Sequence, residues 1–100
     1  MAIEMKKLQD AVATVRHPEI NNSLVELGMI DDLSITDEGK VSFTLLVPML
    51  AIPIRDMLIN MVAEAIAVLD PDVDIEVAVR EMTEEQKMAF FELSKKNWAL

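Results

Sequence analysis

The stretch from Val41 to Val47 has the sequence VSFTLLV and is the strongest strand pattern in the chain. Its residues are β-branched or apolar except for Ser42 and Thr44, which alternate with the apolar positions. The four residues before it, DEGK at 37–40, form a turn in which Gly39 can supply the positive φ that hairpin loops commonly need. The stretch from Met29 to Thr36 is therefore predicted to be the partner strand of a β-hairpin.

An amphipathic helix is predicted to follow this hairpin. Pro53 suits the first helical position, where its missing N–H group costs nothing. Apolar residues then recur at spacings of three and four as far as Leu69, namely Ile54, Met57, Leu58, Met61, Val62, Ala65, Ile66 and Leu69. The sequence DPD at 70–72 ends this helix, and the alternation from Val73 to Val79 predicts a third strand with a mostly acidic outer face.

Helices are also predicted at both ends of the chain. An apolar face from Ile3 to about Val15 indicates a first helix, which Pro18 terminates, and the stretch from Leu24 to Leu27 fits one helical turn closed by Gly28. Thr83 and Gln86 form a capping-box pattern that predicts a C-terminal helix at about 84–96. We expect Met88, Phe91 and Phe90 to be the inward residues of that helix.

The predicted order is helix-strand-strand-helix-strand-helix, without repeats or a linker long enough to divide the chain. This order favours a single small α+β domain over residues 1–100, with a three-stranded mixed sheet and helices packed mainly on one face.

Composition excludes several classes of function. The 100 residues carry a net charge of −9, which makes nucleic acid and anionic membrane surfaces poor partners. The chain has no cysteine, so it cannot form a disulfide, a thiolate metal site or a cysteine nucleophile by itself. Only 2 glycines are present, too few for a phosphate-binding glycine loop. Because the N-terminus is amphipathic and lacks the apolar run of a signal peptide, we expect a cytoplasmic protein.

The single histidine gives little support for catalysis. We expect His17 to be an exposed turn residue before Pro18, with Glu19 beside it. A small metal-dependent enzyme built on these two residues and nearby carboxylates is the weakest alternative, since one histidine cannot supply the three-ligand shell typical of catalytic zinc. No catalytic residue, metal ligand or bound cofactor is predicted.

The connection from Pro48 to Pro53 has the sequence PMLAIP and contains no polar side chain, which is unusual for a surface loop. One interpretation is that it folds over the end of the sheet and completes the core. The other is that Met49, Leu50 and Ile52 form an exposed apolar patch for a partner protein, with Arg55 adding charge.

Several motifs together resemble the opening of the metal-sulfur cluster biosynthesis family, which includes PaaD-like iron-sulfur cluster assembly proteins and the N-terminal extension of Mrp-type carriers. The motifs are VRHPEI at 15–20, LVELGMI at 24–30, EGKV at 38–41, FTL at 43–45 and PIRD at 53–56. The resemblance covers about residues 5–81.

The resemblance implies an adaptor that assists the maturation of iron-sulfur or related metalloproteins through protein contacts. Its partners would be cluster-assembly or cluster-receiving proteins. Ile52 stands where the family usually has a cysteine, and His17 stands where it has an acidic residue. The predicted contact residues are therefore Met49, Leu50, Ile52, Arg55, His17 and Glu19.

Two further expectations remain open at this stage. The missing cysteine also fits a paralogue that kept the scaffold and became a subunit or regulator of an unrelated complex. A homodimer is compatible with the sequence, because a small sheet leaves edge strands to cover and the strand at 41–47 is apolar enough to pair with a second copy.

Overall fold

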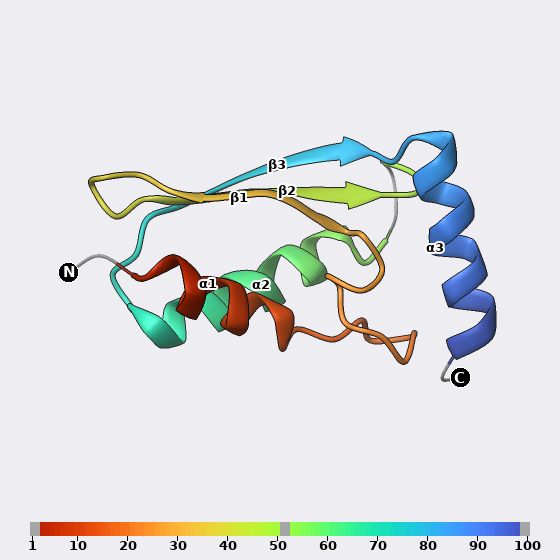
Figure 1. Cartoon of the computed structure of the whole chain (residues 1–100), viewed down its shortest axis with the longest axis horizontal. Coiled ribbons are helices and arrows are strands. Elements are labelled where there is room, and N and C mark those ends of the chain that lie inside the picture. The colour runs from red at the N-terminus through yellow and green to blue at the C-terminus, as the bar shows by residue number, and fades with distance from the viewer. Residues whose placement is uncertain (1–2, 51–52, 99–100) are drawn as a thin grey trace.

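Three helices and three strands, in the predicted order, make up the computed structural model, which describes residues 3–50 and 53–98. Their bounds are α1 Met5–Ala13, β1 Ile30–Ile35, β2 Val41–Val47, α2 Arg55–Leu69, β3 Ile75–Glu81 and α3 Glu84–Asn97. Helices α1 and α2 cover one face of the sheet, whereas α3 stands across its end (Figure 1). The predicted α+β class is confirmed.

Strand β2 is the central strand of the sheet, whose order is β1-β2-β3. The hairpin turn makes β1 antiparallel to β2, and Gly39 in that turn has a φ of 86°. The long return through α2 lets β3 lie parallel to β2, in register from Val41 opposite Ile75 to Val47 opposite Glu81. The expectation that 41–47 would seek pairing with a second copy is wrong, because β2 has a neighbour on both edges.

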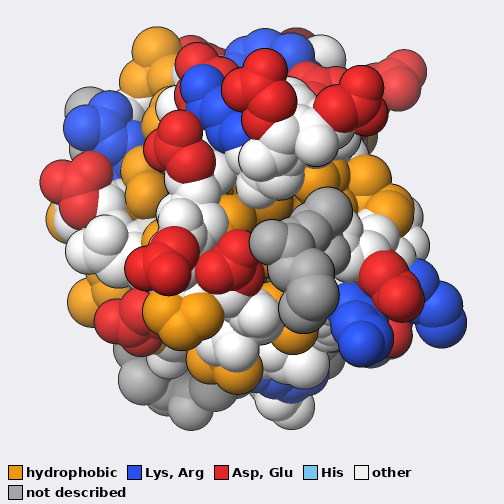
Figure 2. Space-filling view, turned by 90° about the vertical axis from the view of Figure 1, so that its left-hand side faces the viewer, with side chains coloured by type: hydrophobic (Ala, Val, Ile, Leu, Met, Phe, Trp, Pro, Cys, Tyr) orange, Lys and Arg blue, Asp and Glu red, His pale blue; other side chains and the backbone are white. Residues whose placement is uncertain are grey.

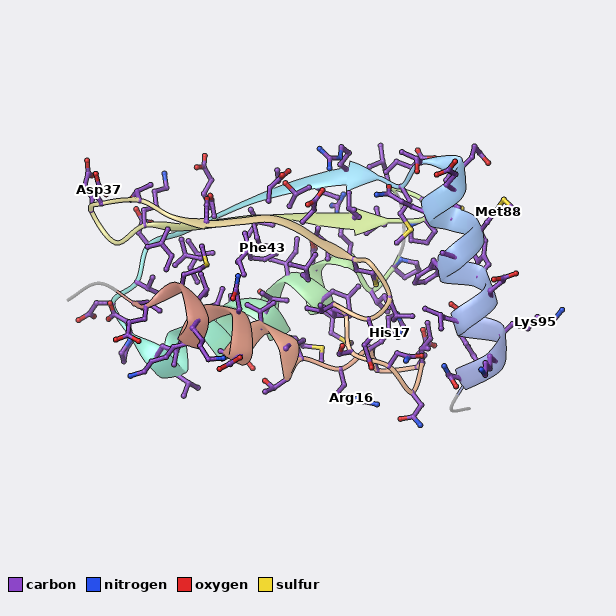
Figure 3. All side chains as sticks on the ribbon, viewed as in Figure 1. Arg16, His17, Asp37, Phe43, Met88 and Lys95 are labelled. Carbon is purple, nitrogen blue, oxygen red and sulfur yellow. The ribbon has the colours of Figure 1, made fainter. Side chains whose placement is uncertain are left out.

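The core lies between the sheet and the two helices below it. Val41, Phe43, Leu45 and Val47 point toward the helices and are at most 2% exposed. Leu58, Val62 and Ile66 of α2 and Leu8 and Val12 of α1 meet them. Figure 3 shows Phe43 between the sheet and the helices. The spacing of these apolar residues, two in the strand and four in the helix, is what the sequence pattern predicted.

The opposite face of the sheet carries a cluster of polar and charged side chains around Thr44. Arg80 donates to Asp31 at 3.0 Å and lies 3.8 Å from Asp32, and the Thr44 hydroxyl donates to Asp32 at 3.2 Å. Strand β1 is irregular between Asp31 and Ser34, and Asp32 has a φ of 53°, a conformation that aspartate tolerates better than most residues. This irregularity explains why the alternation in β1 is imperfect.

Helix α3 differs from the prediction in the residues that it buries. Its capping box is confirmed, since Thr83 Oγ1 accepts from the Gln86 N–H at 3.2 Å and Gln86 Oε1 accepts from the Thr83 N–H at 2.9 Å. Phe90 is buried, but Met88 and Phe91 are 68% and 54% exposed. Because α3 crosses the end of the sheet instead of lying along its face, only a narrow stripe of the helix reaches the body.

Two smaller expectations also need correction. Helix α1 is shorter than the predicted 3–15, because the backbone N–H groups of Thr14 and Val15 bond to the carbonyls three residues earlier, each at 3.2 Å, and the α-helical pattern ends at Ala13. Met57, placed on the inner stripe of α2, is 50% exposed because α1 covers the later turns of α2 and not its first turn.

We predict that Val62→Ala lowers the free energy of unfolding by about 2 kcal/mol, whereas Val68→Ala changes it by less than about 0.5 kcal/mol. Both substitutions lie in α2 and gain the same helix propensity, but Val62 is fully buried and Val68 is 84% exposed. Urea unfolding followed by circular dichroism measures both values. Equal losses would contradict the core described above.

Candidate functional site

A pocket of about 380 Å³ opens at the end of the sheet, between α3 and two loops. We call it the α3 pocket. Its lining comes from three separate stretches of the chain and consists of His17, Glu19, Ile20, Met29, Pro48, Pro53, Ile54, Phe90, Phe91, Ser94 and Trp98. Figure 3 shows His17 on the side of the body that faces α3, and Met88 and Lys95 pointing away from it. The lining is mostly apolar.

His17 organises the first of these stretches. The Nδ1 atom of its imidazole accepts from the backbone N–H group of Glu19 at 3.0 Å. The backbone N–H group of His17 donates to the Asn22 carbonyl at 3.0 Å. A side-chain acceptor that binds the N–H group two residues later is the arrangement of an Asx turn, which aspartate commonly forms. The imidazole thus makes the bond that an acidic residue would make at this position.

His17 is 8% exposed, so the expectation that it is an exposed turn residue is wrong. Burial lowers the pKa of His17, and the nearby Glu19 carboxylate opposes this shift in part. Because Nδ1 acts as an acceptor, the neutral ring carries its proton on Nε2. The imidazole is therefore neutral near pH 7. It holds the turn through its hydrogen bond to Glu19 and adds no charge to the pocket.

Helix α3 is held against the first stretch at its C-terminal end. The Asn97 carbonyl accepts from the Asn21 N–H at 2.8 Å, and the Asn97 side chain donates to Asn22 at 2.7 Å. Ile20 and Trp98 form an isolated antiparallel bridge. At the other end of α3, Lys87 donates to Glu81 at 2.6 Å. These contacts fix the helix as one wall of the pocket.

Ser94 and Trp98 line the pocket, although they are not among the contact residues predicted from the sequence. Phe90 and Ser94 are four residues apart and therefore share one face of α3, which is the signal that could have found Ser94. Trp98 directly follows the last residue of the helix. A search for regularly spaced apolar residues does not select Ser94, because serine is polar. It is nevertheless buried, since its hydroxyl donates to the Phe90 carbonyl at 2.7 Å.

The apolar loop after β2 contributes Pro48, Pro53 and Ile54 to the pocket. Met49 and Leu50 are 62% and 50% exposed, which favours the interpretation of this loop as an exposed apolar patch. The predicted contact residue Ile52 lies outside the described residues. Arg55 does not line the pocket; its guanidinium donates to the Leu50 carbonyl at 3.3 Å and lies 3.6 Å from Asp56, so it braces the loop.

The opposite end of the molecule has a different character. There, a hollow of about 360 Å³ lies between the hairpin turn and the end of α2, and Asp37, Glu38, Asp70, Asp72 and Asp74 surround it. Figure 2 shows Asp and Glu side chains spread over this end. Within residues 3–50 and 53–98, no group of three or more histidine or acidic side chains is arranged to hold a metal ion. The hollow at this end is thus acidic, whereas the α3 pocket at the other end has mostly apolar walls.

None of the helices in the described ranges combines the length and the apolar character needed to cross a membrane.

Comparison with known sequences supports the resemblance seen in the motifs. Residues 6–79 match the family described as iron-sulfur cluster assembly protein. An iron-sulfur cluster carrier protein from Synechocystis sp. is 40% identical over 82 residues, which cover 78% of this chain and 23% of that protein. The chain therefore spans about a quarter of the length of this curated relative.

Comparison with solved structures supports the fold. A domain of unknown function from Bacillus anthracis superposes with a TM-score of 0.70 at 23% identity, covering 89% of this chain and 90% of that one. A conserved hypothetical protein from Thermotoga maritima gives a TM-score of 0.71 at 22% identity, covering 95% of this chain and 94% of that one. At these identities the likeness is evidence for the fold alone.

We predict that stability decreases as the pH falls from about 7.5 to about 5.5, and that His17→Asn removes most of this decrease. The pKa of His17 is lowered on folding, so the unfolded chain binds the proton more readily and acid favours unfolding. Asparagine keeps an acceptor for the Glu19 N–H group but does not titrate. Urea unfolding at several pH values gives the slope.

His17 is the only histidine in the chain, so no other imidazole contributes to the slope in this pH range. The same slope in the wild type and in His17→Asn would show that burial of His17 is not the source of the pH dependence.

Proposed function

The chain belongs to the iron-sulfur cluster assembly protein family, and on this basis we propose that it is a non-catalytic cytoplasmic adaptor that contacts cluster-assembly or cluster-receiving proteins. The α3 pocket, together with the exposed apolar residues beside it, is the proposed contact surface. The observation that carries this proposal is the exposure of Met49 and Leu50 next to a pocket with mostly apolar walls.

The exposed side chains support a protein contact. Met49 and Leu50 directly follow Pro48, which lines the pocket. Phe91 of α3 and Trp98 just beyond its end are about half exposed. Large apolar side chains gathered around a hollow commonly mark protein-binding surfaces. Met49 can also adapt its shape to a partner, because its side chain is unbranched and flexible.

The absence of cysteine from the sequence limits how the chain can take part in cluster assembly. Iron-sulfur clusters are usually held by cysteine thiolates, and this chain offers none. In the proposed function the cluster is cargo held by partners. The chain brings partners together or positions one of them, and it supplies no thiolate ligand.

A catalytic role receives no support from the geometry of His17. Nδ1 is occupied by the Glu19 N–H group, and the described residues provide no third ligand for a metal ion beside His17 and Glu19. A metal-dependent enzyme is therefore not carried forward as a candidate function.

A second candidate is favoured by the departures from the family motif. Ile52 replaces the usual cysteine, and the His17 imidazole preserves the turn without the acidic group. Both fit a paralogue that retained the scaffold and contacts an unrelated complex through the same surface.

A homodimer remains a prediction. The strands at the edges of the sheet, which could pair with a second copy, are β1 and β3.

The test is depletion of the chain in cells, followed by re-expression of variants. We predict that depletion lowers the activities of iron-sulfur enzymes relative to enzymes without clusters, and that Leu50→Ser fails to restore them. Leu50→Ser should also weaken partner capture about fivefold or more, as truncation of a central contact residue does.

Leu69→Ser is the matched control, because Leu69 is 37% exposed at the C-terminal end of α2 and lies outside the α3 pocket. It should restore activity. Unchanged iron-sulfur enzymes after depletion would contradict the adaptor role. Capture of a complex without cluster-related proteins would favour the second candidate.

A further inference from the structure

Glu19 is the charged residue of the α3 pocket. It is the single charged side chain in the described lining, since the lowered pKa of His17 keeps the imidazole neutral. Within residues 3–50 and 53–98, the Glu19 carboxylate has no ion-pair partner and accepts no hydrogen bond; the bond of Glu19 to His17 uses its backbone N–H group. The pocket therefore presents one unpaired negative charge beside apolar walls.

Nearby cations are engaged elsewhere. Arg16 donates to Asn21 at 2.8 Å and lies 4.0 Å from Glu26. Arg55 donates to the Leu50 carbonyl. Lys95 points away from the body on the outer side of α3 (Figure 3). None of these three cations pairs with Glu19, and no other lysine or arginine in the described part of the chain forms an ion pair with it, so a cation from a partner can occupy this position.

A cation that reaches Glu19 beside these apolar walls gains more than it would in open water. Partial exclusion of water strengthens the attraction between opposite charges, and the aromatic side chains of Phe91 and Trp98 can add cation–π attraction. The net charge of −9 also raises the encounter rate with positively charged segments. The negative charge of Glu19 and the apolar and aromatic walls thus both favour a positively charged group that is attached to an apolar segment.

We infer that the α3 pocket binds a partner-protein segment in which a large apolar side chain stands next to a lysine or arginine. The apolar side chain enters between Phe90, Phe91 and Trp98, and the ammonium or guanidinium group pairs with Glu19. This inference deepens the proposed function and rests on it for the conclusion that the natural occupant is a protein. It adds the chemistry by which the pocket selects its partner.

A random peptide library displayed on phage and selected against the purified chain tests this inference. Enriched peptides should combine an aromatic or large aliphatic residue with a nearby lysine or arginine. Selection on Glu19→Gln should retain the apolar residue but lose the basic preference. Glu38→Gln is the matched control, because it removes the same charge at the hairpin turn on the opposite end of the molecule.

Binding of the most enriched peptide can be measured by fluorescence, since Trp98 lines the pocket and is the only tryptophan in the chain. We expect Glu19→Gln to weaken binding about three- to tenfold and Glu38→Gln to leave it nearly unchanged. Replacing the basic residue of the peptide by norleucine should weaken binding to the wild type, but not further to Glu19→Gln. Circular dichroism confirms that both variants fold.

The inference is overturned by a selection without enrichment, by enriched peptides without basic residues, or by equal losses in Glu19→Gln and Glu38→Gln. Its failure can be separated from failure of the proposed function. If depletion leaves iron-sulfur enzymes unchanged while Glu19-dependent peptide binding holds, the adaptor role is wrong and the pocket chemistry stands. If depletion lowers those enzymes while peptide binding ignores Glu19, the adaptor role stands and this inference is wrong.

Discussion

The burial of strand β2 is the constraint on which the rest of the structure depends. The helix-facing residues of β2 are at most 2% exposed, and both of its edges are paired. Because β2 is enclosed on its edges and on one face, the position at which the chain leaves it is fixed. Pro48, the next residue, lies buried at the end of the sheet. Helix α2 begins at this same end and returns beneath the sheet (Figure 1). The apolar loop, the His17 turn and α3 consequently meet in one place, and the α3 pocket is a product of this topology.

The hollows at the two ends of the molecule differ in the side chains that line them. Carboxylates surround the hollow between the hairpin turn and the end of α2, whereas mostly apolar side chains line the pocket beside α3. A partner can therefore be attracted by the overall negative charge and held by apolar contact at the other end. Glu19 links these two features, because it brings one negative charge into the apolar site.

Much of the fold could be predicted from the sequence, because spacing reports which face of a strand or helix is buried. The hairpin, α2 and the capping box of α3 were predicted correctly on this basis. The orientation of α3 could not be predicted, since its apolar residues do not say whether the helix lies along the sheet or across its end. Met88 and Phe91 were therefore placed inward, although they are exposed. The burial of His17 was missed for a similar reason, because it depends on α3 and on the turn at Asn22, which lie outside the local pattern.

The central claim is that the end of the sheet beside α3 is the contact surface for the partner. Hydrogen exchange measured by mass spectrometry, with and without a captured partner, tests it most directly. The account predicts slower exchange at 16–22 and 88–98, with no change at the hairpin turn 36–40 or at 70–74. Protection at the hairpin turn or along β3, with unchanged exchange at 16–22 and 88–98, would contradict it.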